Sequence, residues 1–372
     1  MSALRWTLVI ILYWWVSFLV DNGYSYGGGG FDGNGGGSVR RSDGFFGKVR
    51  DFFCDERYIE LSFISLLVGF SLILYELASY VYLYFVKVVP FLAAMHSGDY
   101  MVRNIAGMFY TFCCVFVPFF VSCLIMRRTG VMKRELPFTA PEKGAGVFFL
   151  VLAGLGLCFA GNIFTSIFAS SASSVGVEFS SYNQSLTADI YLPENVFEFI
   201  IMSFHTAVFP AVFEEFAFRG VVMQPLRKYG DWFAIIVSAV IFGFAHGNMT
   251  QMPFAILAGL ALGYAAVVTK SLWTSIIIHF FNNFISLLYS FMGEILESHR
   301  VIVFNGLLIY GIILIGIVAF AGYVKLNPRF NILRPSEKPV KYSRATAVFI
   351  LMPTMLFSFI KMLTNVASDI VF

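Results

Sequence analysis

Charged and imidazole side chains lie inside three apolar segments of this chain, where charge is costly. Glu214, Glu215 and Arg219 are set in a segment otherwise made of Phe, Val, Ile and Ala. His246 ends a second apolar segment, and His279 lies within a third. A charged residue at the centre of a bilayer costs about 2.5–3.5 kcal/mol on insertion scales. These residues therefore predict a polar site enclosed by a bundle of helices.

The spacing of the acidic segment assigns different tasks to its two carboxylates. Glu215 and Arg219 are four residues apart, which places them on one helix face as an intrahelical ion pair. Glu214 points about 100° away and has no local partner. A carboxylate beside a basic group in a low-dielectric setting can be tuned to act as a general base. We therefore expect Glu214 to be the base, and Glu215 and Arg219 to fix the helix face and the local field.

The histidines add the remaining parts of a hydrolytic site. His279 and Asn283 are four residues apart, so both can donate hydrogen bonds to one developing oxyanion. His246 comes from another helix and could hold a water molecule jointly with Glu214. A base, a water-positioning group and two oxyanion donors are sufficient for peptide hydrolysis without a covalent nucleophile.

The elements that carry these residues are predicted to be membrane helices in an all-α polytopic bundle. The chain has 372 residues, of which 58% are hydrophobic and only 13% charged, whereas a quarter of the residues of a soluble domain are charged. The net charge of +3 is small, and no segment interleaves aromatic and basic residues as a nucleic-acid surface does. We expect a multi-pass protein of the cell membrane with the lipid bilayer, not nucleic acid, as its surroundings.

About nine apolar runs are candidate membrane segments. They lie at about 61–86, 105–126, 145–169, 196–224, 232–246, 252–269, 271–290, 302–324 and 346–366. The loop 127–143 is basic and is predicted to be cytoplasmic, whereas 171–195 contains no Lys or Arg and is predicted to lie outside. Alternation then puts 227–228 and 325–344 inside, and 247–248 outside.

The regions before these runs are of a different kind. Residues 1–21 form an apolar segment that fits either a signal peptide or an uncleaved anchor. Residues 22–58 combine a glycine-rich linker with a basic juxtamembrane stretch. The remaining chain divides into N-terminal membrane helices (59–195), a core that carries the site (196–290) and C-terminal membrane helices (291–372).

The three polar constellations resemble the motifs of the CPBP family, the CAAX proteases and bacteriocin-processing enzymes also called the Abi family. That family is marked by EExxxR, FxxxH and HxxxN/D on successive membrane helices. The corresponding residues here are Glu214-Glu215…Arg219, Phe242…His246 and His279…Asn283. The resemblance covers about residues 196–290 and does not extend to the glycine-rich N-terminal region.

The resemblance implies an intramembrane endopeptidase of the glutamate type. In such an enzyme Glu214 activates water with His246, His279 and Asn283 form the oxyanion hole, and Glu215 and Arg219 support them. Two acids and two histidines could also ligate zinc. No HExxH pair is present, and an asparagine suits an oxyanion better than a metal, so we favour catalysis without a metal or other cofactor while zinc stays open.

These residues are consistent with two functions. The first is hydrolysis of a peptide bond in a membrane-associated or prenylated (CAAX-type) protein or peptide by glutamate-activated water. The alternative is a non-catalytic immunity or scaffold protein of the same family, for example in bacteriocin immunity. A transporter is disfavoured, because such proteins commonly contain paired halves with interrupted helices and each motif here occurs once.

Overall fold

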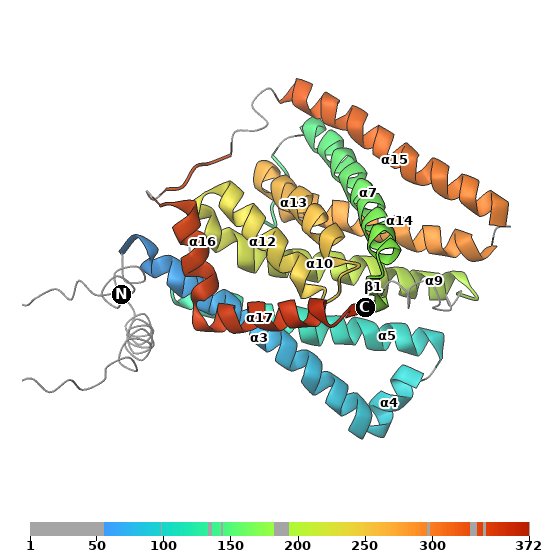
Figure 1. Cartoon of the computed structure of the whole chain (residues 1–372), viewed down its shortest axis with the longest axis horizontal. Coiled ribbons are helices and arrows are strands. Elements are labelled where there is room, and N and C mark those ends of the chain that lie inside the picture. Colours follow the sequence, from blue (N-terminus) through green and yellow to red (C-terminus); the bar gives the residue numbers. More distant parts are fainter. Residues whose placement is uncertain are drawn as a thin grey trace, which may run out of the picture.

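The computed structural model describes residues 56–97, 99–132, 136–142, 144–181, 193–295, 298–327, 333–337 and 340–371. Both N-terminal segments predicted from the sequence, 1–21 and nearly all of 22–58, lie outside the described residues. Within them the chain is an all-α bundle, as predicted (Figure 1). The helices are α3 (Glu56–Val88), α4 (Pro90–Ser97), α5 (Tyr100–Thr111), α6 (Val117–Arg128), α7 (Gly144–Ser174), α9 (Val196–Ser203), α10 (Phe209–Glu214), α11 (Met223–Leu226), α12 (Asp231–Ala245), α13 (Met252–Thr269), α14 (Leu272–Ile295), α15 (Ser298–Leu326), α16 (Tyr342–Leu351) and α17 (Pro353–Ala367). Three π-helical turns, η1 (Phe112–Phe116), η2 (Phe204–Val208) and η3 (Glu215–Val222), and the 3-10 turn η4 (Arg227–Tyr229) join some of them.

Seven helical stretches in the described part of the chain are long and apolar enough to cross a bilayer. They correspond to seven of the nine predicted runs, so the chain is a multi-pass membrane protein. The run at 232–246 is the 15-residue helix α12, which is shorter than a full span.

The last predicted run differs from a straight span. The structure divides it into α16 and α17, which are bent by 84°. Met352 between them is extended, with φ −65° and ψ 139°. Pro353 explains the break, because a proline disfavours the helical conformation of the residue before it.

Small residues allow the helices around the site to approach closely. A Cβ atom on Gly259 of α13 would lie 2.9 Å from Cα of Ala239 in α12. A Cβ atom on Gly156 of α7 would lie 2.7 Å from Cα of Gly316 in α15. Membrane helices use such positions for van der Waals packing, because burial of apolar surface gives no driving force in lipid.

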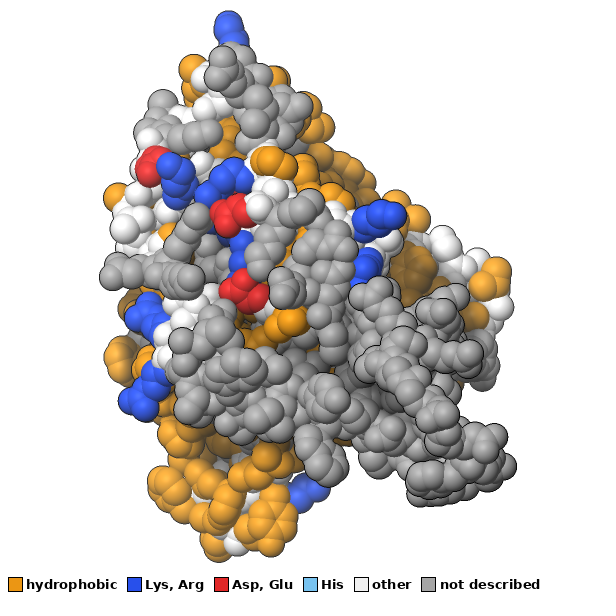
Figure 2. Space-filling model, turned by 90° about the vertical axis from the view of Figure 1, so that its left-hand side faces the viewer, with side chains coloured by type: hydrophobic (Ala, Val, Ile, Leu, Met, Phe, Trp, Pro, Cys, Tyr) orange, Lys and Arg blue, Asp and Glu red, His pale blue; other side chains and the backbone are white. Residues whose placement is uncertain are grey.

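Loops that are distant in sequence meet at one end of the bundle, which we call the basic face. The Leu272 amide donates to the Pro137 carbonyl at 2.8 Å, and Lys270 Nζ pairs with Glu142 at 2.7 Å. Arg334 lies 3.8 Å from Asp231. Figure 2 shows Lys and Arg side chains spread over this end. The predicted inside loops therefore do share one end of the molecule.

The predicted outside loops meet at the opposite end, which we call the far face. Strand β1 (Glu178–Phe179), which follows α7, pairs antiparallel with β2 (Ile370–Val371) at the C-terminus. The Asp369 carboxylate accepts from the backbone amides of Ser181 at 2.7 Å and Met249 at 2.8 Å, and from the Ser180 hydroxyl at 2.7 Å. Burial alone would raise the pKa of Asp369, but these hydrogen bonds hold the pKa below its usual value. One carboxylate thus ties three far-face segments together.

Candidate active site

The helix that carries the paired glutamates is interrupted on both sides of them. It runs from α9 through η2, α10 and η3 into α11, so that Glu214 ends α10 and Glu215 begins the π-helical turn. Pro210 lies in the first turn of α10 and has no amide to donate to the preceding turn. The Ser238 hydroxyl of α12 donates to the Phe218 carbonyl within η3 at 2.8 Å. π-Helical turns occur frequently at functional sites, and this one begins directly after Glu214.

Glu215 and Arg219 form the ion pair that their spacing predicts. Arg219 Nη1 lies 3.1 Å from Glu215 Oε1, and both side chains are completely buried. The guanidinium also lies over the Phe242 ring, 4.2 Å from its centroid. A desolvated cation over an aromatic face contributes about 2 kcal/mol or more. The pair therefore forms a rigid, charged support behind the site.

His279 lies between the two glutamates. Its Nδ1 is 3.0 Å from Glu215 Oε1, and its Nε2 is 3.9 Å from Glu214 Oε2. Because a carboxylate only accepts, Nδ1 carries the proton of the shorter contact. The ring is thereby oriented by Glu215 so that Nε2 faces Glu214.

His246 follows the last residue of α12, and a backbone carbonyl fixes its ring. Its Nδ1 lies 2.8 Å from the Phe242 carbonyl, so Nδ1 donates and Nε2 is the acceptor of the neutral ring. The Phe242 ring packs edge-on against the imidazole, with the centroids 4.8 Å apart. Phe242 is therefore the contact shared by Arg219 and His246.

Two neighbouring asparagines of α14 also lie at the site. Asn283 Nδ2 donates to the Thr206 carbonyl of η2 at 3.3 Å, so its amide is engaged there in this structure. Asn282 Nδ2 donates to Asn283 Oδ1 at 3.0 Å. Among the described residues the Asn282 oxygen has no hydrogen-bond partner although it is buried. The HxxxN spacing in the sequence indicates Asn283 alone and misses Asn282.

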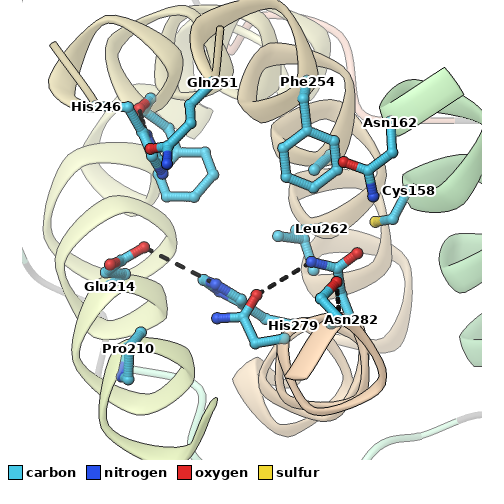
Figure 3. Close-up of a pocket in the computed structure, with 14 residues that line it drawn as sticks. Cys158, Asn162, Pro210, Glu214, His246, Gln251, Phe254, Leu262, His279 and Asn282 are labelled. Atoms are coloured by element: carbon cyan, nitrogen blue, oxygen red, sulfur yellow. Dashed lines mark hydrogen bonds and ion pairs between the residues drawn. The ribbon is translucent and has the colours of Figure 1, made fainter. Parts of the chain in front are cut away.

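These side chains surround a cavity of about 410 Å³ (Figure 3). Its lining residues are Cys158, Asn162, Pro210, Glu214, Phe242, His246, Gln251, Phe254, Ala258, Leu262, His279, Asn282, Asn283 and Ser286. Four of the six predicted site residues, Glu214, His246, His279 and Asn283, line it. Glu215 and Arg219 lie behind its wall.

Part of the cavity comes from residues outside the three motifs. Cys158 and Asn162 reach it from α7. Gln251 reaches it from the position just before α13, and Phe254 from the first turn of α13. Their positions depend on how α7 and α13 pack, which no local spacing reveals. An amide side chain within an apolar run, as Asn162 is in α7, is the one signal that could have drawn attention to it.

Within the described residues no group of three or more His, Cys, Asp or Glu side chains is arranged to hold a metal ion. Of the four candidate zinc ligands, Glu215 is paired with Arg219, and the Nδ1 atoms of both histidines are occupied. The Nε2 atoms of both histidines remain for hydrogen bonding to water or for a metal, because Nδ1 donation orients histidines in both kinds of site.

Comparison with known proteins identifies the same region. Residues 196–285 match a family model described as Rce1-like, type II CAAX prenyl endopeptidase Rce1-like. Neither a curated protein nor a solved structure matches the chain. The matched segment runs from α9 to α14 and so contains all three motifs.

Proposed function

We propose that the chain is an intramembrane endopeptidase in which Glu214 activates water, because residues 196–285 match the Rce1-like family model of type II CAAX prenyl endopeptidases. Its substrate is a membrane-associated or lipid-modified protein or peptide. The family match supports the protease activity, and the geometry of the cavity supports the roles of the individual residues.

One observation carries this proposal: only one of the two adjacent glutamates faces the cavity. The Glu214 side chain is 22% exposed and lies among polar cavity residues, whereas Glu215 is completely buried in its contacts with Arg219 and His279. A general base must lie within hydrogen-bond reach of the proton that it removes, directly or through one water. Glu214 alone meets that requirement, so Glu215 is a positioning residue.

The reaction follows from these positions. A water molecule bound between Glu214 and His246 Nε2 gives one proton to the Glu214 carboxylate while its oxygen attacks the peptide carbonyl. The carbonyl oxygen becomes an oxyanion, to which an asparagine amide donates. His279 is a second donor in the form that carries a proton on Nε2 as well as on Nδ1. The protonated Glu214 then gives its proton to the leaving nitrogen as the C–N bond breaks, which restores the carboxylate. General-base action of this kind contributes roughly 10²–10⁴-fold to the rate.

For Asn283 to donate to the oxyanion, its amide must release the carbonyl that it contacts in this structure. Asn283 donates to the Thr206 carbonyl at 3.3 Å, near the long limit of a hydrogen bond. Substrate binding exchanges that carbonyl for the developing oxyanion, and Asn282, which is hydrogen-bonded to Asn283, moves with it. Removing one oxyanion donor typically costs about 10²–10³ in kcat.

The test is cleavage by the purified full-length protein in detergent. It is incubated with a pool of quenched fluorescent peptides, prenylated and unprenylated, and compared with Glu214→Gln and with the control Glu142→Gln. Glu142 lies in an exposed pair with Lys270 on the basic face, far from the cavity. Cleavage by wild type and Glu142→Gln, its loss in Glu214→Gln and indifference to a chelator are expected.

Other outcomes contradict parts of the proposal. Loss of cleavage with chelator, and recovery with zinc, would replace the metal-free mechanism by a metal-dependent one. Full biological activity of Glu214→Gln in the host would favour a non-catalytic immunity or scaffold protein.

A further inference from the structure

The cavity is sealed on the side of the basic face. The Glu215–Arg219 pair and Ser275 lie in that direction, and all three side chains are completely buried. On α14 the first residue to line the cavity is His279, seven residues beyond Leu272. At 1.5 Å per residue this corresponds to roughly 10 Å of helix filled by packed side chains. A peptide cannot reach Glu214 from the basic face without breaking that layer.

The cavity extends instead toward the far face. Its lining includes Ser286, which is about 20 Å along α14 from Leu272. It also includes Gln251, an exposed residue in the connection between α12 and α13. Figure 3 shows Gln251 and His246 at one end of the cavity and His279 at the other. The mouth of the cavity therefore lies at the α12–α13 connection.

The far-face segments form a fixed rim beside this mouth. The Met249 amide donates to Asp369, and the Thr250 hydroxyl lies 2.5 Å from the Ser181 hydroxyl. Gly247 allows the turn after His246 with φ +69°. Because these contacts hold the α12–α13 connection to β1 and to the C-terminus, the position of the mouth is built into the fold.

The charges of the two ends are unequal. Most described Lys and Arg residues near helix ends belong to the basic face, namely Arg127, Arg128, Arg227, Lys228, Lys270, Lys325, Arg334, Lys341 and Arg344. The opposite helix ends and loops carry Lys87, Arg103 and Arg300. An excess of Lys and Arg in short loops marks the cytoplasmic side of a membrane protein. The basic face is therefore the cytoplasmic one.

We propose that the cavity opens to the non-cytoplasmic side of the membrane, and that the substrate is a peptide segment presented there. Such a segment belongs to an exported peptide or to the outer juxtamembrane stretch of a membrane protein. This inference rests on the proposed function. Of the two substrate classes proposed above, this opening favours the membrane-associated peptide, because a lipid-modified tail in the cytoplasm would face the closed side of the cavity.

The polar groups near the mouth fit a neutral peptide backbone. Asn162, Gln251 and Ser286 offer uncharged donors and acceptors, and Phe254 offers an apolar surface between them. No Lys or Arg is among the described residues that line the cavity, so a terminal carboxylate finds no charge partner there. An internal peptide bond suits this lining better than a bond next to a free C-terminus.

The test is labelling of three single-cysteine substitutions in the full-length protein with a membrane-impermeant maleimide. Gln251→Cys lies at the mouth, Ser368→Cys is an exposed position on the far face, and Ser343→Cys is an exposed position on the basic face. Each is labelled in intact cells and again after permeabilisation, and the modified site is identified by peptide mass spectrometry. Labelling in detergent confirms that each thiol can react.

In intact cells the Gln251→Cys and Ser368→Cys variants are expected to be labelled, and the Ser343→Cys variant is expected to lose its labelling. The reverse pattern would overturn the orientation. Labelling of Ser368→Cys without Gln251→Cys in intact cells would overturn the position of the mouth. Because the assay needs no substrate, its failure is distinct from failure of Glu214→Gln to abolish cleavage.

Discussion

Replacing one member of the buried Glu215–Arg219 pair tests how much this ion pair contributes to the free energy of unfolding. Removal of one partner from a buried ion pair costs about 3–5 kcal/mol, because the remaining charge is left without compensation. In Arg219→Met the carboxylate of Glu215 keeps His279 Nδ1 at 3.0 Å, so we expect a loss near 3 kcal/mol. In Glu215→Met the guanidinium keeps the Phe242 ring beside it but loses the carboxylate at 3.1 Å, so we expect a loss near 5 kcal/mol.

The double variant Glu215→Met/Arg219→Met completes a thermodynamic cycle. It removes both charges and replaces them by apolar groups of similar length, so its loss should be smaller than the sum of the two single losses. Directly contacting residues show interaction energies of about 0.5–3 kcal/mol, and we expect this pair at the upper end because neither side chain is exposed.

The assay is equilibrium unfolding in mixed detergent micelles, followed by intrinsic fluorescence. The control is the surface pair Lys270–Glu142, which is shorter at 2.7 Å but whose side chains are 60% and 58% exposed. Glu142→Gln should change the free energy of unfolding by less than about 1 kcal/mol. Single losses below that of the control, or a double variant equal to the sum of the singles, would refute the assignment of a coupled buried pair.

Three further predictions concern packing, the far face and the π-helical turn. Gly316→Ala should cost about 1–3 kcal/mol, because the added Cβ would lie 2.6 Å from a backbone atom of α7. Gly311→Ala on the same helix places its Cβ in open space and should not destabilise the protein. Thermal unfolding of the two variants measures the difference. The folded-state pKa of Asp369 is below its usual value of 3.8, so its contribution to stability is fully present above pH 3.8 and is lost as the pH falls through the folded pKa. Asp369→Asn should therefore unfold at a lower temperature than wild type at neutral pH. On acidification its unfolding temperature should fall less than that of wild type. Ser238→Ala should cost about 1 kcal/mol, because the buried hydrogen bond to the Phe218 carbonyl is lost, and chemical denaturation measures the difference.

The sequence predicts the helical class, the ends at which loops meet and the ion pair, because each follows from local composition or spacing. Glu215 and Arg219 remain within reach of each other although π-helical turning replaces the assumed 100° per residue. The bend at Met352 could have been expected from Pro353, since a proline inside an apolar run marks a probable break.

Other parts of the site depend on tertiary packing and could not be predicted. Asn162 reaches the cavity because α7 crosses α13 and α14 closely: a Cβ atom on Gly154 would lie 2.8 Å from the Ile278 side chain. Asp369 meets the segment after His246 across 120 positions of sequence. Nothing in the local pattern around either residue indicates these contacts.

The central claim is that Glu214 removes a proton from the attacking water, and one measurement tests it most directly. It is the single-turnover rate constant of Glu214→Gln on a substrate identified from the peptide pool, with the dissociation constant of that substrate measured separately. We predict a rate constant lower by roughly 10²–10⁴-fold with substrate binding and thermal stability retained. A rate constant within a few-fold of wild type would contradict the claim and assign the chemistry to another group.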